Sequence, residues 1–233
     1  MTSSPRLLAI DTSTEACSAA LLLDGEVTER WQLAPRAHAE LILPMVEELL
    51  AAAGVSLAGL DAVAFARGPG AFTGLRIATG VVQGLSFAAD RPVVAVSTLA
   101  ALALGAARQH GAQRVLAALD ARMNEVYWGA YLAGDDGLVG LQGEERVCRP
   151  EEVPVLGEGG WFGAGSGWAA YAEPLAARLS GSVSATDGGL LPRAGDVARL
   201  AAHRFTQEGG VPAAEALPIY LRNEVVQAPP IAK

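Results

Sequence analysis

Apolar residues occur in short blocks along the first hundred positions of the chain. Residues 7–11 form a continuous apolar run that ends in an acid, a pattern typical of a strand covered on both faces. Asp24 and Gly25 join the next two apolar segments, which indicates a hairpin. Later runs predict two more strands. The expected strands are 7–11, 16–23, 27–33, 61–66 and 93–96.

Between and after these strands, apolar residues follow helical spacing. An apolar stripe runs along 37–53 and ends at Gly54, which predicts a helix with a glycine stop. A second helix is expected at 72–89 and a third at 98–109. Strands that alternate with helices favour an α/β fold whose sheet is mixed and whose parallel part is covered by helices.

The second half of the chain partly repeats this order. Residues 115–120 form an apolar run that ends in Asp120, as the first strand ends in Asp11, and a second apolar segment follows at 125–132. Two lobes of related plan are the economical interpretation. Chance is the alternative, because a buried strand that ends in Asp is common.

Weaker patterns occupy the rest of the chain. Helical spacing predicts helices at 168–179 and 194–207. The expected lobes are 1–109 and 110–233, of which the C-terminal one is expected to be abbreviated. The terminal segment from about 215 could pack back on the first lobe, and the pattern leaves this open.

The composition excludes several classes of protein. The 233 residues carry a net charge of -8, which disfavours tight binding of nucleic acid by this chain alone. The only lysine is Lys233, so P-loop, kinase and Schiff-base chemistries lack their ammonium group. The longest apolar stretch, 99–107, is too short for a membrane span, and the first residues do not resemble a signal peptide. We expect a cytoplasmic protein with no membrane association.

Two acids and a glycine-rich turn are the candidates for nucleotide chemistry. Asp11 and Asp120 end predicted strands, where they could hold Mg²⁺ or orient a water, or could simply cap the following turns. Thr12 could hydrogen-bond a phosphate, and Gly163 and Gly165 of the FGAGSG segment could cradle one. A plain tight turn is the preferred interpretation of FGAGSG, because the segment lacks the P-loop lysine.

Metal, redox and nucleophile motifs have little support. Cys17 and Cys148 lie far apart in the sequence, and the three histidines form no local pair. The chain has no G-x-S-x-G segment, so the sequence gives little support for a hydrolase.

The helix expected at 72–89 is apolar on every face. Arg76 is its only charge, and Gly80 and Gly84 lie one turn apart, where they would let another helix approach closely. Such a helix must be covered all round, either inside its own fold or by a partner, and both alternatives stay open. With 37–53 it could form a two-helix surface for a second copy or a related chain. The candidate interface residues are Leu41, Met45, Leu49, Arg76, Ile77, Gly80, Val81 and Gly84.

Five segments, in order along the chain, resemble the TsaB (YeaZ) family. The resemblance implies a two-lobe actin- and Hsp70-like fold, which is an α/β, ribonuclease H-like (ASKHA) architecture with mixed sheets. It also implies a non-catalytic dimerisation subunit of the bacterial machinery that makes threonylcarbamoyladenosine in tRNA. Ala39 and Ala71 stand where the family often has serine. The segments are LLAIDTS at 7–13, HAELILPM at 38–45, RGPGAFTGLR at 67–76, DAR at 120–122 and YLR at 220–222.

The resemblance also implies partners. A TsaD-like catalytic paralogue would pair its helices with 37–53 and 72–89, a TsaE-like ATPase would join, and a homodimer through the same surface is a further option. The complex would modify the adenosine next to the anticodon, and this chain would meet tRNA only through it. ATP and a metal would belong to partner subunits, so no cofactor is expected here. Where TsaD carries a metal-binding His pair, residues 97–102 contain no histidine.

Two alternatives come from the enzyme classes. A small actin-like ATPase or phosphotransferase acting alone would use Asp11, Asp120 and the FGAGSG turn, and calorimetry with ATP and Mg²⁺ would reveal it. A peptidase is the third option, and it lacks both a nucleophile motif and a metal pair.

Overall fold

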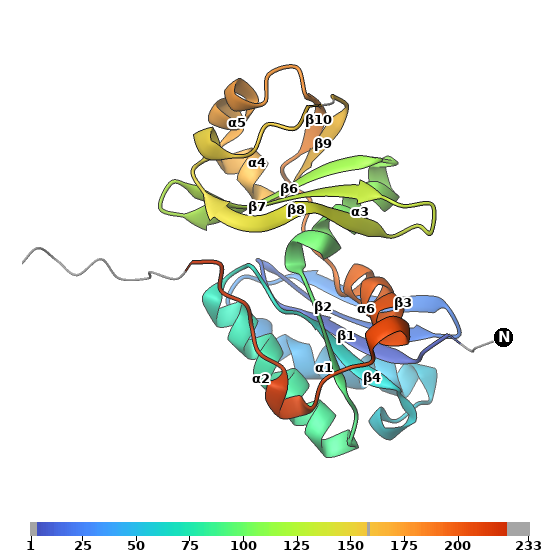
Figure 1. The fold of residues 1–233 in the computed structure, drawn as a ribbon. Coiled ribbons are helices and arrows are strands. Elements are labelled where there is room, and N and C mark those ends of the chain that lie inside the picture. The colour runs from blue at the N-terminus through green and yellow to red at the C-terminus, as the bar shows by residue number, and fades with distance from the viewer. Residues whose placement is uncertain (1–3, 158, 223–233) are drawn as a thin grey trace, which may run out of the picture.

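The computed structural model describes residues 4–157 and 159–222, which form two stacked lobes with a five-stranded sheet in each (Figure 1). The strand order is β3-β2-β1-β4-β5 in the first sheet and β10-β9-β6-β7-β8 in the second. The first sheet contains β1 Leu7–Asp11, β2 Ala16–Leu23, β3 Glu26–Leu33, β4 Ala62–Ala66 and β5 Val93–Val96. The second contains β6 Arg114–Arg122, β7 Glu125–Ala133, β8 Val139–Cys148, β9 Trp161–Ala164 and β10 Val183–Asp187.

The two sheets repeat one plan. In the first, β1 pairs antiparallel with β2 and parallel with β4. In the second, β6 pairs antiparallel with β7 and parallel with β9. The strand order 3-2-1-4-5 therefore corresponds to 8-7-6-9-10, and Asp11 and Asp120 lie near the ends of equivalent strands. The prediction of two lobes of related plan is confirmed.

Helices cover both faces of the first sheet. Leu8 and Ile10 of β1 face a core shared with α1 and α2, whereas Leu7 and Ala9 face a core shared with α6. The run that predicted a doubly covered strand is thus buried along its whole length. The helices are α1 His38–Ala53, α2 Phe72–Ala89, α3 Thr98–His110, α4 Ser166–Ala170, α5 Ala172–Arg178 and α6 Ala194–Glu208. Three short 3₁₀ turns are η1 Leu57–Gly59, η2 Pro150–Glu152 and η3 Ala213–Glu215.

The lobes exchange their last helices. α3 follows β5 of the first sheet, yet its Leu102 packs with Tyr131 in the core of the second. α6 follows β10 of the second sheet, yet its Val197 packs with Leu22 in the core of the first. The segment 110–233, expected to form the second lobe, therefore supplies a helix that covers the first lobe. None of the helices described here combines the length and hydropathy that a membrane span requires.

One expected helix is wrong as a continuous element. Residues 168–179 form the end of α4 and the separate helix α5, which meet at the non-helical Tyr171. Pro174 has no N–H to donate to the carbonyl of Ala170, which weakens a continuous helix here and favours a break in the preceding turn.

Candidate functional site

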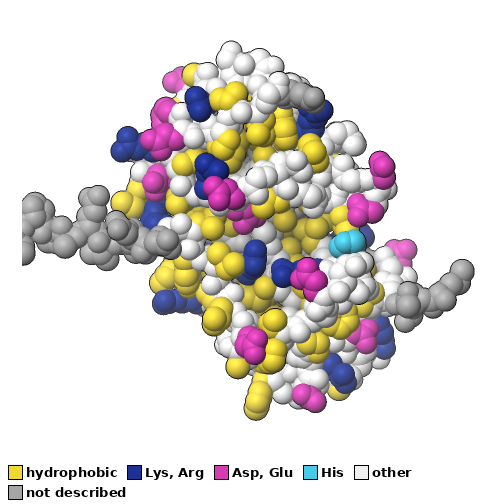
Figure 2. Space-filling view, viewed as in Figure 1, with side chains coloured by type: hydrophobic (Ala, Val, Ile, Leu, Met, Phe, Trp, Pro, Cys, Tyr) yellow, Lys and Arg dark blue, Asp and Glu magenta, His cyan; other side chains and the backbone are white. Residues whose placement is uncertain are grey.

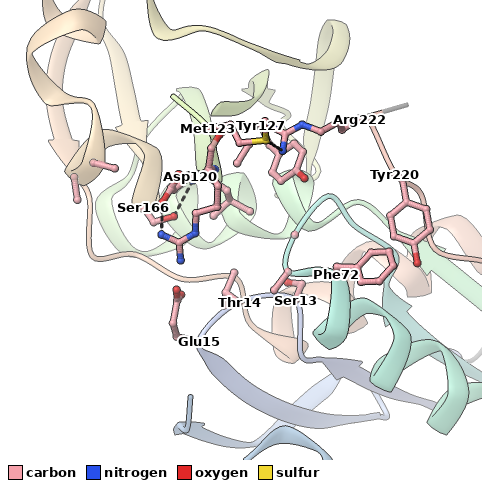
Figure 3. A pocket seen from close by; sticks show the side chains of 17 residues that line it. Ser13, Thr14, Glu15, Phe72, Asp120, Met123, Tyr127, Ser166, Tyr220 and Arg222 are labelled. Atoms are coloured by element: carbon pink, nitrogen blue, oxygen red, sulfur yellow. Dashed lines mark hydrogen bonds and ion pairs between the residues drawn. The ribbon is translucent and has the colours of Figure 1, made fainter. Parts of the chain in front are cut away.

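A cleft of about 670 Å³ lies between the lobes (Figure 3). The first lobe contributes the turn after β1, with Ser13 and Thr14, and the start of α2. The second lobe contributes the β6–β7 turn and α4, and Tyr220 and Arg222 from the end of the described chain complete the wall. The cleft therefore lies at the ends of the equivalent strands β1 and β6, where α/β folds often bind ligands.

Asp120 faces this cleft and also organises its own turn. Its Oδ1 accepts hydrogen bonds from the Arg122 backbone N–H at 2.8 Å and from the Tyr171 hydroxyl at 3.1 Å. Its Oδ2 lies 2.7 Å from the Arg122 guanidinium. Asp120 therefore caps its turn and also faces the cleft, while a role toward Mg²⁺ or a water stays a prediction.

Asp11, the equivalent acid, is enclosed by protein instead. It is 1% exposed, and its Oδ1 accepts a hydrogen bond from the Ser13 N–H at 2.7 Å. Its Oδ2 has no hydrogen-bond partner among the described residues. Burial raises the pKa of Asp11 to about 6, and the charge of Glu29 adds to this, while the Ser13 hydrogen bonds act in the opposite direction. Asp11 caps a turn and does not line the cleft.

The other predicted nucleotide-binding residues are also packed against protein. Thr12 donates its hydroxyl to the Gly74 carbonyl at 2.7 Å. A Cβ on Gly163 would lie 2.4 Å from the Trp168 ring, and one on Gly165 would lie 2.5 Å from the Ala118 carbonyl. Among the five predicted residues, only Asp120 lines the cleft. Gly163 and Gly165 thus allow close packing against a ring and a strand, which is in keeping with the plain tight turn that the sequence favours for FGAGSG.

The decapeptide 67–76 joins three parts of the molecule. A Cβ on Gly74 would lie 1.9 Å from the Thr12 carbonyl, so glycine lets α2 begin directly against the β1–β2 turn. Gly68 has a φ of +112° and would bring a Cβ within 2.6 Å of the Ile219 carbonyl. These close approaches explain why the segment needs glycine where it does.

The helix α2 has one buried and one exposed face. Leu75, Ala78 and Val82 are buried, and Ala78 and Val82 pack in the core against the first sheet. On the other face Phe87 is 83% exposed, and no atom of the described chain outside the helix backbone lies within 4 Å of where a Cβ would stand on Gly80 or Gly84. Figure 2 shows hydrophobic side chains gathered over the lower left of the molecule, where α2 lies in Figure 1. The described chain therefore leaves the outer face of α2 uncovered.

The predicted interface residues divide between these two environments. Met45 and Leu49 of α1 are 7% and 1% exposed and belong to the core, so they cannot contact a partner without unpacking the lobe. Leu41, Ile77 and Val81 are half-buried, and Arg76, Gly80 and Gly84 are exposed.

Of three further apolar side chains near this surface, Leu43 is expected from the sequence to add to the two-helix surface, whereas Phe72 and Phe87 are not among the candidate residues. All three side chains are exposed in the structure. The available signal was apolar character away from the main stripe of each helix, which marks a second apolar face.

Residues 97–102, which contain no histidine, form the mainly apolar start of α3. Leu99 and Leu102 are fully buried in the core of the second sheet. Beside them, the Ser97 hydroxyl and the Tyr131 hydroxyl both donate to Glu145 Oε1, which ties α3 to β7 and β8. Among the described residues, no group of three or more His, Cys, Asp or Glu side chains could hold a metal ion.

The cysteines lack the character of reactive thiols. Burial raises the pKa of Cys17 to about 11 and that of Cys148 also to about 11. Both therefore stay protonated near neutral pH.

The paired mixed sheets around a central cleft define an actin- and Hsp70-like two-lobe protein. A profile described as "TsaD: tRNA N6-adenosine threonylcarbamoyltransferase" matches residues 31–160. Taken with the relatives described next, this shows that the chain belongs to the TsaB (YeaZ) family.

Two curated relatives carry the name "tRNA threonylcarbamoyladenosine biosynthesis protein TsaB". The Escherichia coli K12 protein is 45% identical, with 94% of this chain and 96% of that protein covered. The Haemophilus influenzae protein is 46% identical, with 94% of each covered. The solved structure described as "YeaZ from Pseudomonas aeruginosa" is 53% identical with a TM-score of 0.86, covering 93% of this chain and all of that one. Another solved structure, described as similar to peptidase YEAZ from the same organism, has 53% identity, a TM-score of 0.88 and coverage of 94% and 100%.

Proposed function

We propose that this chain is a non-catalytic scaffold subunit in the synthesis of threonylcarbamoyladenosine in tRNA. In this role it binds a TsaD-like catalytic paralogue and holds it in its active arrangement. Family membership supports the pathway, and the uncovered outer face of α2 is the observation that carries the scaffold role.

The glycines of α2 support a partner on that face. Each glycine inside a helix costs about 0.5–1 kcal/mol relative to alanine. Nothing in the described chain uses the space beside Gly80 or Gly84, so the isolated protein gains nothing from them. A partner helix that packs closely against this face would use both positions, because small residues let two helix backbones approach.

Exposed apolar side chains lie on the same side of the lobe. Phe72 and Phe87 of α2 and Leu43 of α1 remain exposed. Covering them gains roughly 25 cal/mol for each Å² of apolar surface removed from water. The surface that we propose for the paralogue consists of these three residues with Arg76, Gly80 and Gly84.

The division of labour follows from this role. The paralogue transfers the threonylcarbamoyl group to the adenosine beside the anticodon, and ATP and the metal belong to partner subunits. A TsaE-like ATPase joins the assembly, and tRNA is held mainly by other subunits, which suits the net charge of -8. The same surface supports a homodimer when the paralogue is absent.

The interface is tested with Gly80→Arg and Gly84→Arg. Arginine favours helix more than glycine does, and both sites are open, so the isolated chain should fold normally. We expect affinity for the paralogue to fall by about 100-fold or more, since a long charged side chain blocks a close helix contact. Gly140→Arg is the matched control, because Gly140 is an exposed glycine with open space in β8 of the other lobe.

Calorimetric titration and reconstituted tRNA modification are the measurements. Unchanged affinity in both α2 variants would refute this interface. Full tRNA modification by the other subunits without this chain would refute the scaffold role itself.

A nucleotide-dependent ATPase acting alone is the second candidate. The cleft and the position of Asp120 favour it, while the burial of Asp11 and the covered glycine turn count against it. Calorimetry with ATP and Mg²⁺ distinguishes this ATPase from the scaffold. Micromolar binding with turnover by the isolated chain would support the ATPase.

A further inference from the structure

The last described segment of the chain runs along α2 toward the cleft. After η3, Ala216 is buried, and its carbonyl accepts a hydrogen bond from Gln83 Nε2 of α2 at 2.9 Å. Three residues later, the Ile219 N–H donates to the Arg67 carbonyl at 2.8 Å. Figure 1 shows this red segment crossing the first lobe beside α2. The segment is thus fastened to the first lobe at two backbone positions.

At the cleft, the segment joins an aromatic and cationic stack. The rings of Tyr220 and Phe72 have centroids 5.4 Å apart, and the Arg76 guanidinium lies 3.8 Å from the centre of the Phe72 ring. Arg76 Nε also donates to the Tyr220 hydroxyl at 3.4 Å. Tyr220 therefore has contacts on α2 while its side chain forms part of the cleft wall (Figure 3).

Arg222 crosses to the other lobe. Its guanidinium donates to the carboxylate of Glu125 in β7, and its Nη1 lies 3.4 Å from the Met123 sulfur in the β6–β7 turn. The side chains of Arg222 and Glu125 are 18% and 30% exposed, so solvent screens this ion pair less than it screens an ordinary surface pair. Seven residues, Ala216–Arg222, therefore connect α2 to the second lobe.

We propose that Ala216–Arg222 is a strap across the mouth of the cleft, held closed by the ion pair between Arg222 and Glu125. The lobes are otherwise joined through the exchanged helices, as in the ion pair between Arg108 of α3 and Asp196 of α6 at 2.6 Å. Those contacts hold the lobes together, while the strap sets how far apart the two cleft turns can move. The proposal does not depend on the scaffold role, because it concerns the isolated chain.

Hydrogen exchange of the full chain tests the strap. Two amides serve as reporters: that of Ser13, which is buried in the cleft turn of the first lobe, and that of Ile219, which donates to the Arg67 carbonyl from within the strap. In Arg222→Ala we expect both amides to exchange about tenfold faster, which corresponds to ~1.4 kcal/mol. Arg222→Glu combined with Glu125→Arg restores the ion pair with reversed charges and should restore slow exchange.

A matched control removes an ion pair within one lobe. Arg30→Ala breaks the pair between Arg30 of β3 and Glu48 of α1, and it should leave both reporter amides unchanged. Unchanged exchange in Arg222→Ala would overturn the strap. Faster exchange that the charge reversal leaves in place would exclude the ion pair as the fastening. An increase throughout the chain, including the β1–β2 ladder, would also overturn it, because the effect would then be loss of the fold.

Discussion

The two halves of this protein share a sheet but differ in what covers it. In both sheets, three antiparallel strands lie beside two parallel strands. The first half adds two long helices, α1 and α2, on one face, whereas the second has the short η2 after β8 and the broken pair α4 and α5 after β9. In the first half, α2 therefore presents an outer face with the exposed apolar side chains Phe72 and Phe87. The repeated sheet supplies the frame, and the differences in the covering helices locate the surface for a partner.

The largest effect should separate the two faces of α1. Leu49→Ala removes a fully buried side chain from the core and should lower the free energy of unfolding by about 2–5 kcal/mol. Leu43→Ala, on the exposed face, should change it by about 0.5 kcal/mol or less. Chemical denaturation of both variants measures the difference. A similar loss of unfolding free energy in both variants would show that Leu43 is as buried as Leu49. The proposed difference between the two halves would then be wrong.

The equivalent acids should differ in how they affect stability with pH. Because the folded-state pKa of Asp11 is raised from 3.8 to about 6, protonated Asp11 favours the fold. This contribution is fully present below pH 3.8 and is lost as the pH rises through 6. At ~1.4 kcal/mol for each pKa unit, ionised Asp11 costs about 3 kcal/mol above that range.

Asp11→Asn tests this sign. Asparagine stays neutral and keeps an oxygen for the Ser13 N–H, so the variant should gain stability over the parent between about pH 4 and pH 7. Asp120→Asn is the matched control, since its ion pair with Arg122 is largely exposed on the arginine side and worth less than about 1 kcal/mol. Thermal melts across this range make the comparison, and a stability gain that does not grow with pH would contradict the pKa of Asp11.

Local patterns predicted the elements well where one chain segment decides the outcome. The strand 93–96 and the helix 72–89 have the expected bounds, because period and stop signals lie within each segment. The prediction of one helix at 168–179 was wrong. It rested on the helical spacing of apolar residues and gave too little weight to Pro174, which lacks an N–H.

The site residues were harder to predict because their neighbours come from distant parts of the chain. Met45 and Leu49 form a proper helical stripe, but the stripe does not say whether the first sheet or a partner covers it. Likewise, the sequence around Gly163 allows a tight turn or a phosphate-binding turn, and it does not show that Trp168 packs against this glycine. Asp11 and Asp120 share a sequence pattern, and only the packing around them buries one and exposes the other to the cleft.

The glycine turn of the second half should tolerate no side chain. Gly163→Ala would place a methyl group 2.4 Å from the Trp168 ring, which is buried and held by a hydrogen bond from its Nε1 to the Leu116 carbonyl. We expect a loss of about 1–3 kcal/mol, typical of overpacking. At about 2–4 °C for each kcal/mol, calorimetry should detect this readily. A neutral result would mean that the turn has room for a ligand and would reopen the case for a phosphate cradle.

The smallest effect has the opposite sign. Gly80→Ala on the open face of α2 should raise the free energy of unfolding by about 0.5–1 kcal/mol, because alanine restricts the unfolded chain and favours helix. The same methyl group should weaken binding of the paralogue, because it separates two helices that pack closely. Denaturation and calorimetric titration on one preparation measure both effects. A stabilised variant with unchanged affinity would remove the reason for glycine here. Higher stability together with weaker binding would show that glycine lowers the stability of this half in exchange for binding a partner.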